Sequence, residues 1–178
     1  MSKIKLDFNS EQNILNMLMD SSSISTDQMS KINATSPEIG KSKLETAIEL
    51  NFTDESKIQK ILSTNYSLEL ISLEKKVIDP KIKKIIDLRY LQDNLLVPFE
   101  MSGGVLKIAI ADASKLGLMK NLKTITKMEP ELYAATISDI NDFIDRMSRQ
   151  DSKKISSSNV KVEKIEKNKD ELIEVGSE

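Results

Sequence analysis

The sequence LLVPFEMSGGVLKIAIADAS, residues 95–114, decides how this chain folds. Two apolar runs, residues 95–100 and 105–110, flank a short segment that contains two consecutive glycines. Glycine adopts positive φ without steric cost, and tight turns between antiparallel strands require that backbone conformation. We therefore predict a β-hairpin in which the MSGG segment forms the turn.

The segment before the hairpin predicts a strand followed by a helix. Residues 68–73 (LELISL) are typical of a short strand. Asp79 followed by Pro80 predicts a helix N-terminus, because proline fits the first helical position, where no backbone donor is needed. The apolar residues that follow, up to Arg89, share one helical face.

The segment after the hairpin completes a β-α-β-β-α-β-α order. Ser114 predicts the start of a helix, residues 132–135 predict a strand, and Ser138 is expected to cap the last helix. This order matches a split βαβ sandwich with one added helix. We predict an α+β fold in which two helices cover one face of a four-stranded, mainly antiparallel sheet over residues 66–150.

Residues 1–65 are predicted to form a four-helix subdomain. Two capping boxes, Ser25 with Gln28 and Ser42 with Glu45, mark helix starts, because each pair can satisfy two backbone amides that a helix N-terminus leaves free. Asp54 and Glu55 place acid at the start of the fourth helix.

Breaks and a weak repeat organise the same part of the chain. Pro37 and Gly40 are expected to break the chain between helices. The apolar spacing around Leu18 recurs around Ala47, with a period near 29 residues. Two such units are too few for a solenoid, so a helical subdomain is favoured.

The composition excludes several chemistries. The 178 residues include no Cys, no His and no Trp, and 26 basic against 28 acidic side chains give a formal net charge of -2. There is therefore no Ser-His or Cys-His pair and no zinc site of the usual nitrogen and sulfur ligands. The balanced charge also speaks against nucleic acid as a partner.

The two ends of the chain carry further predictions. The last 28 residues, 151–178, mix Ser, Lys and Glu and contain none of the three Tyr and four Phe residues, so we predict a flexible charged linker. The first ten residues (MSKIKLDFNS) lack the apolar core of a signal peptide. No apolar run approaches the ~18 residues of a membrane span, so we expect a cytoplasmic protein.

A cluster of five lysines is the candidate partner-binding site. Around Glu74 and Asp79, a local excess of positive charge suggests either a solvated helix face or contact with anionic lipid headgroups or an acidic partner. The five residues are Lys75, Lys76, Lys81, Lys83 and Lys84.

Two further features are interpreted as structural. Gly103 and Gly104 do not belong to a phosphate-binding loop, because the G-x-x-x-x-G-K-[ST] spacing and a following helix are missing. Asp112 ends a strand, where functional carboxylates often lie, but no second carboxylate or base can be placed beside it. We expect it to serve a turn or a cap.

Two stretches resemble the N-terminal domain of the type II secretion and type IV pilus assembly ATPases. They are residues 65–73 (NYSLELISL) and, more specifically, residues 95–114 (LLVPFEMSGGVLKIAIADAS). Further similarity covers about residues 12–149. The family's common Asp-Pro is Asp112-Ala113 here, and the glycine before the fourth helix is Asn51.

The resemblance implies a non-catalytic adaptor and regulatory domain. In that family the domain docks the motor to the cytoplasmic part of an inner-membrane platform protein, and the parent chain carries the ATPase domain. The chain would then reach the membrane only indirectly, and would be part of a hexamer only through the parent ATPase. No cofactor, metal or catalytic residue is expected in this chain.

Some members of that family bind cyclic di-GMP through two tandem motifs, and the resemblance extends to the apolar spacing of both. In the first copy the motif's Arg, two glycines and Gln correspond to Asn13, Leu15, Ser22 and Ser36. In the second copy these places hold Ser42, Leu44, Asn51 and Asn65. The replacements favour helix packing over ligand binding.

Two alternatives to the adaptor remain open. The chain could be a sensor of cyclic di-GMP, or of another nucleotide, with altered residues. It could also be a stand-alone protein-interaction domain that is unrelated to a motor. The gene sequence beyond Glu178 would distinguish the stand-alone domain from the adaptor of a motor.

Overall fold

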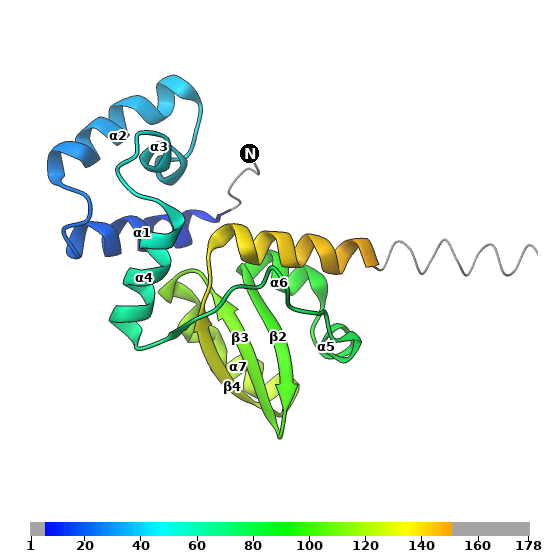
Figure 1. The fold of residues 1–178 in the computed structure, drawn as a ribbon. Coiled ribbons are helices and arrows are strands. Elements are labelled where there is room, and N and C mark those ends of the chain that lie inside the picture. Colours follow the sequence, from blue (N-terminus) through cyan, green and yellow to red (C-terminus); the bar gives the residue numbers. More distant parts are fainter. Residues whose placement is uncertain (1–5, 151–178) are drawn as a thin grey trace, which may run out of the picture. The chain divides into compact units, whose positions relative to one another are not determined.

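Four helices make up the first part of the fold (Figure 1). They are α1 (Phe8–Asp20), α2 (Thr26–Ile39), α3 (Lys43–Glu49) and α4 (Glu55–Tyr66). The structure is a computed structural model that describes residues 6–150. The chain divides into two compact units, residues 1–144 and 145–178. The predicted linker, residues 151–178, lies outside the described residues, and the boundary at residue 65 stays a prediction.

Local side-chain caps start these helices where the sequence places them. The hydroxyl of Ser25 accepts from the Gln28 amide, and the Gln28 side chain accepts from the Ser25 amide. Ser42 and Glu45 form the second capping box in the same way, and Asp54 caps α4. The predicted helix starts are therefore confirmed.

The predicted break at Pro37 is wrong, because Pro37 lies inside α2. Proline removes only one backbone donor, the one that would reach the Asn33 carbonyl, and the helix continues to Ile39. The helix ends instead at Gly40, whose φ of 65° is the left-handed conformation that glycine adopts readily.

The weak repeat of the sequence is present in the backbone. Ser22 after α1 and Asn51 after α3 both have left-handed φ, 56° and 55°. At each turn the next residue donates back to the helix, from Ser23 to the Leu18 carbonyl at 2.9 Å and from Phe52 to the Ala47 carbonyl at 3.0 Å. Both are Schellman turns, and they stand 29 residues apart like the apolar pattern.

The second part of the fold surrounds a four-stranded sheet. Its elements are β1 (Glu69–Leu70), α5 (Pro80–Ile85), α6 (Leu88–Asn94), β2 (Leu96–Ser102), β3 (Val105–Ile110), the 3-10 helix η1 (Ala113–Leu118), α7 (Met119–Thr126) and β4 (Glu129–Ala134). Residues 137–150 are helical. The hairpin of β2 and β3 is confirmed, but its turn is shorter than predicted: Gly103 and Gly104 form it with positive φ, while Met101 and Ser102 are paired residues of β2.

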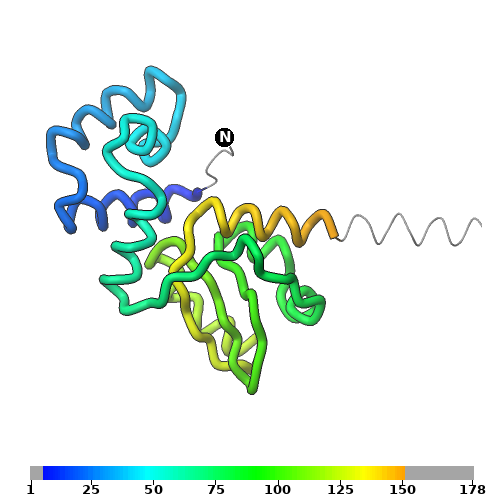
Figure 2. Tube along the Cα trace, in the orientation of Figure 1, coloured from blue at the N-terminus to red at the C-terminus, as the bar shows by residue number. Residues whose placement is uncertain are grey.

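The prediction of a mainly antiparallel sheet is wrong. The strand order is β1-β4-β3-β2, in which β4 pairs in parallel with both β1 and β3, and only β2 and β3 are antiparallel. The chain leaves β3 through η1 and α7 before it enters β4, as the trace in Figure 2 shows. Such a helical crossover returns the chain in its original direction, so β4 runs parallel to β3. The fold remains α+β, but it is not a split βαβ sandwich.

Two helix boundaries also differ from the predictions. The helix predicted from Pro80 to Arg89 is two helices, because Asp87 accepts from the Arg89 amide at 2.7 Å and caps α6. The last helix is capped by Thr136, whose hydroxyl accepts from the Asp139 amide at 3.1 Å, and Ser138 already lies within it.

The sheet and the helices that pack on it, which we call the sandwich, have an aliphatic core centred on β3. Leu106, Ile108 and Ile110 are buried, as are Ala109 and Ala111 between and after them. α7 packs against β4 with Leu122 buried, and α5 and α6 pack against β2. Within residues 6–150 no helix has the length and apolar character that a membrane crossing requires.

The first testable prediction concerns the left-handed residue Ser22. The left-handed conformation costs a residue with a Cβ roughly 1–2 kcal/mol. Glycine avoids this cost, but its unfolded chain has more conformational entropy to lose, which cancels part of the gain. We expect Ser22→Gly to raise the free energy of unfolding by up to about 1 kcal/mol, measured by chemical denaturation. Asn51→Gly is the control and should gain less, because Asn tolerates this conformation. A loss of stability in Ser22→Gly would contradict the turn.

Candidate functional site

The five predicted lysines lie on the segment that leads into α5 and on α5 itself. Lys75 and Lys76 precede the helix, and Lys81, Lys83 and Lys84 belong to it. We call residues 75–84 the lysine segment. Three of these side chains are exposed, namely Lys75, Lys81 and Lys84. Lys81 and Lys84 stand three positions apart, a spacing that places side chains on one face of a helix.

Lys76 ties the lysine segment to the sheet. Its ammonium lies 3.8 Å from a carboxylate oxygen of Glu100 and 5.3 Å from the centre of the Phe99 ring, both on β2. The next residue, Val77, is 85% exposed. The segment is therefore held by Lys76 and by the buried Ile78 and Ile82, and it presents the apolar side chain of Val77 between exposed lysines.

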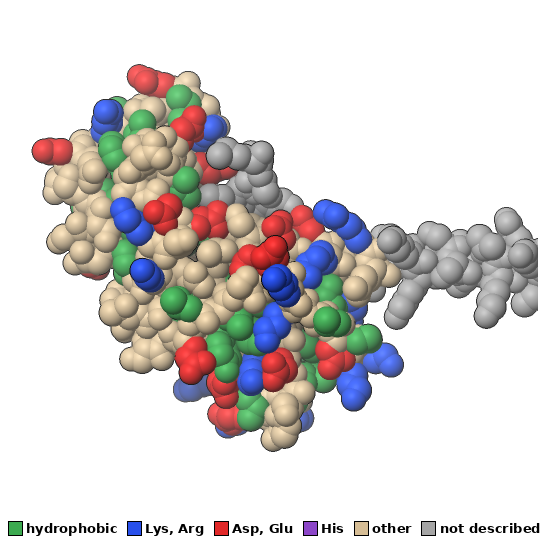
Figure 3. All heavy atoms as spheres, viewed as in Figure 1, with side chains coloured by type: hydrophobic (Ala, Val, Ile, Leu, Met, Phe, Trp, Pro, Cys, Tyr) green, Lys and Arg blue, Asp and Glu red, His purple; other side chains and the backbone are tan. Residues whose placement is uncertain are grey.

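The sheet beside Lys76 carries a mixture of charges. Glu100 and Lys107 form an ion pair of 2.8 Å, Tyr133 donates to Glu131, and the Phe99 and Tyr133 rings meet edge to face at 5.3 Å. The hydrogen bond from Lys107 lowers the pKa of Glu100, and the same bond raises the pKa of Lys107. Figure 3 shows acidic and basic side chains interspersed on this view of the molecule instead of one basic area.

Two of the four positions that correspond to the first copy of the cyclic di-GMP motif, Asn13 and Leu15, make contacts within the chain. Asn13 accepts from the Ala113 amide at 3.3 Å, and Leu15 is buried where the motif has a glycine. Ser36 is buried, whereas Ser22 is exposed in the left-handed conformation described above. The positions are thus distributed over the interior and the surface of α1 and α2.

The second copy follows the same scheme. Ser42 caps α3, and Leu44 is fully buried. Asn51 keeps the left-handed backbone of a glycine, and Asn65 is exposed near the end of α4. The glycine-like geometry of the two turns is retained, but the groups that would meet a phosphate or a base are not.

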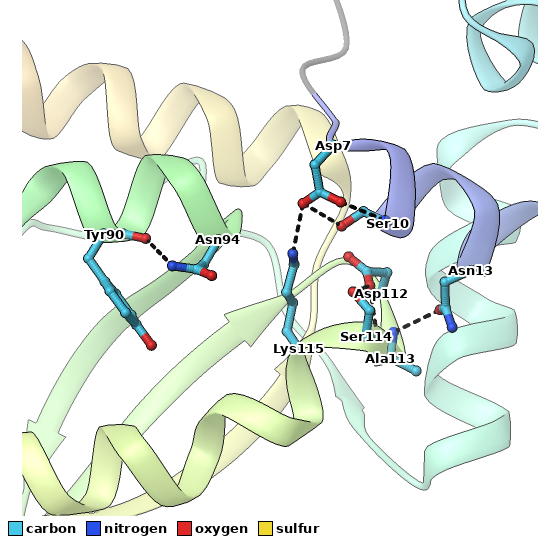
Figure 4. Close-up of polar contacts among 9 residues, drawn as sticks. All are labelled: Asp7, Ser10, Asn13, Tyr90, Asn94, Asp112, Ala113, Ser114 and Lys115. Atoms are coloured by element: carbon cyan, nitrogen blue, oxygen red, sulfur yellow. Dashed lines mark hydrogen bonds and ion pairs between the residues drawn. The ribbon is translucent and has the colours of Figure 1, made fainter.

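A second polar cluster, which the sequence did not predict, joins α1 to η1 (Figure 4). Asp7 caps α1 by accepting from the Ser10 amide at 2.8 Å, and its other oxygen lies 2.9 Å from the Lys115 ammonium. The Lys115 side chain is only 8% exposed, whereas Asp7 is 43% exposed. These partners are 108 positions apart, and no local pattern in the sequence marks such a pair.

Asp112 lies in the same cluster and is confirmed as a cap. One carboxylate oxygen accepts from the Ser114 amide at 2.8 Å and also from the Ser114 hydroxyl. The second oxygen is buried, with no hydrogen-bond partner in the part of the chain that the structure describes. Residues 6–150 hold no group of three or more acidic side chains arranged to bind a metal ion.

The pKa of Asp7 gives a prediction for acid stability. Burial tends to raise it, but the hydrogen bonds from Ser10 and Lys115 and the charge of Lys115 lower it below the usual 3.8. A lowered carboxyl pKa stabilises the folded state above pH 3.8, and this contribution disappears as the pH falls through the folded-state value. We expect Asp7→Asn to cost less than about 1 kcal/mol near neutral pH, because the carboxylate is partly exposed.

The measurement is urea denaturation of the two proteins between pH 7 and the acid limit of folding. The difference in free energy of unfolding between them should shrink as the pH drops below 3.8. Lys115→Met is the matched control, since it removes the same ion pair from the other side. A difference that is independent of pH would show that the Asp7 charge does not stabilise the fold.

Comparison with known proteins places these features in a family. The MshEN domain family matches residues 66–154, which is half of the chain. The type IV pilus assembly ATPase PilB of Myxococcus xanthus is 29% identical over 93 residues, which are 52% of this chain and 16% of that protein. The chain thus spans about a sixth of the length of this relative.

Two solved structures share the fold. The structure of MshE with cdg has a TM-score of 0.55 at 21% identity and covers 75% of this chain and 96% of that one. The N-terminal domain of XpsE has a TM-score of 0.56 at 19% identity and covers 80% and 98%. Together with the family match, these likenesses confirm the predicted resemblance. The chain belongs to the MshEN domain family, the N-terminal domain of type II secretion and type IV pilus assembly ATPases.

Proposed function

We propose that this chain is a non-catalytic adaptor and regulatory domain that docks a motor ATPase to the cytoplasmic part of an inner-membrane platform protein. The observation that carries the proposal is the lysine segment, in which exposed Lys75, Lys81 and Lys84 accompany the exposed Val77. A surface of this kind fits a partner patch that has acidic groups around an apolar centre. Family membership supplies the motor as the setting.

The carboxylates and lysines that could take part in catalysis are engaged in helix caps and ion pairs, which supports a non-catalytic domain. Asp112 caps η1, Asp7 pairs with Lys115, and Glu100 pairs with Lys107. Gly103 and Gly104 form the hairpin turn. ATP hydrolysis would belong to another part of the parent chain, and a hexamer would form through that part.

In this proposal the domain acts in the cytoplasm and is peripheral to the inner membrane through its partner. The charge mixture around Glu100 and Lys107 suits specific pairing with one protein surface better than attraction to any polyanion. Nucleic acid is accordingly not a proposed partner.

A test of the docking surface removes the three exposed lysines of the segment. In Lys75→Ala/Lys81→Ala/Lys84→Ala, binding to the platform protein's cytoplasmic domain should weaken by about tenfold, because each exposed pair contributes less than about 1 kcal/mol. The loss should be largest at low salt, where charges at the rim of an interface act most strongly. Calorimetry at two salt concentrations measures both effects.

The matched control changes the same number of charges elsewhere. Lys43, Lys57 and Lys60 are exposed on α3 and α4, and their replacement by Ala should leave binding unchanged. Circular dichroism should show that both triple variants stay folded. Equal affinity of the wild type and the lysine-segment variant for the partner would reduce the segment to a solvated surface.

A cyclic di-GMP sensor is the second candidate, favoured by the likeness to MshE with cdg. At 21% identity that likeness is one of fold, and the corresponding positions here are filled by Asn13, Leu15, Ser42 and Leu44. Two of these are buried leucines in place of glycines that would let a ligand approach the backbone.

We therefore predict that the chain does not bind cyclic di-GMP. Isothermal titration calorimetry with the dinucleotide in large excess should give no saturable heat. Saturable binding in the micromolar range would contradict the prediction and favour the sensor. The stand-alone interaction domain, the third candidate, would be favoured if the gene had a stop codon directly after Glu178 and no P-loop sequence followed.

A further inference from the structure

Only one of the two carboxylate oxygens of Asp112 takes part in its capping contact. Its first carboxylate oxygen accepts both bonds from Ser114, and the residue is 0% exposed. Its second oxygen is buried and has no partner among residues 6–150. Asn caps a helix as well as Asp does, so the cap alone does not require a carboxylate. A buried carboxylate oxygen without a donor lowers the stability of the state that contains it.

A suitable donor lies on the same short helix. Lys115 lies in the first turn of η1, three positions after the N-cap Asp112, so the two side chains leave neighbouring points of the backbone. In the structure, however, its ammonium is bound to Asp7 at 2.9 Å, on the N-terminus of α1. Figure 4 shows Asp7, Asp112 and Lys115 directed into the same space between α1 and η1.

We propose that Lys115 is a two-position latch, which pairs with Asp7 while α1 is docked on η1 and with the second oxygen of Asp112 when this contact opens. Each state then contains one ion pair, and only the docked state leaves a buried oxygen without a donor. Transfer of the ammonium to Asp112 would give the buried oxygen a donor and would thereby reduce the free energy that opening costs. The latch is separate from docking, because it acts at the contact between α1 and η1.

The Ala113 amide reports directly on this contact. It donates to Asn13 of α1 at 3.3 Å, so its hydrogen exchange requires the contact to open. The Ser114 amide is an internal reference for the Asp7 variant only, because its bond to the N-cap Asp112 does not involve α1. The amides of β3 report unfolding of the sandwich and should exchange at unchanged rates.

The experiment measures amide hydrogen exchange by NMR in the whole 178-residue chain. Asp7→Asn removes the docked partner of Lys115 and should speed exchange at Ala113 by about threefold. Asp112→Asn keeps the capping oxygen but removes the open-state partner, and should slow it by about threefold. Opposite signs at the two carboxylates are the signature of the latch.

A cap that merely holds η1 gives a different result. In that case Asp112→Asn leaves the Ala113 rate unchanged or raises it, and either outcome overturns the proposal. Asp112→Ser is a second variant that keeps a capping oxygen without the extra carboxylate oxygen, and it should also slow exchange.

The role of Lys115 is tested in a double-mutant cycle. The effect of Asp112→Asn on Ala113 exchange should be smaller in a Lys115→Met background, because the ammonium that would move to Asp112 is then missing. Equal effects in the two backgrounds would show that Lys115 does not transfer, and would also overturn the latch.

Discussion

The parallel pairing of β4 with both β1 and β3 is the constraint on which the first unit depends. β4 lies between β1, which follows the four helices in the chain, and β3 of the hairpin. At its end, the Ala134 carbonyl accepts from the Ile71 amide and from the side chain of Gln59 on α4. A few residues later Ser138 donates to Glu55, at the start of α4. The end of β4 therefore fixes α4 to the sheet.

Sequence reasoning succeeded where an interaction is local. The caps at Ser25 and Ser42 involve residues three positions away, so the side chains that form them are visible in a short window. The prediction of the direction of β4 failed, because strand direction is set by where the chain returns after α7, and no short window of sequence shows this. The lysine segment is visible in the sequence as a run of charge, and its role stays a prediction, whereas the Asp7–Lys115 pair, 108 positions apart, leaves no sequence signal.

The repeat of α1–α2 and α3–α4 separates backbone geometry from chemistry. Ser22 and Asn51 adopt the left-handed conformation that glycine would adopt most easily, so the turn geometry is present without glycine. At Leu15 and Leu44 the space beside the backbone is filled by buried side chains. A site that retains its frame but is filled with apolar volume contributes packing, which is why we favour an adaptor over a nucleotide sensor.

The contacts between the helical part and the sandwich are rich in polar groups. Asp7 with Lys115, Asn13 with Ala113, and Gln59 with Ala134 all cross this boundary. Breaking such a contact exposes groups that water or a neighbouring residue can satisfy, so the net stabilisation from each is small. Opening a boundary built only on buried aliphatic side chains would cost much more free energy, because it would expose apolar area to water. These polar contacts therefore position α1 and α4 on the sheet, while each of them adds little to the stability of the fold.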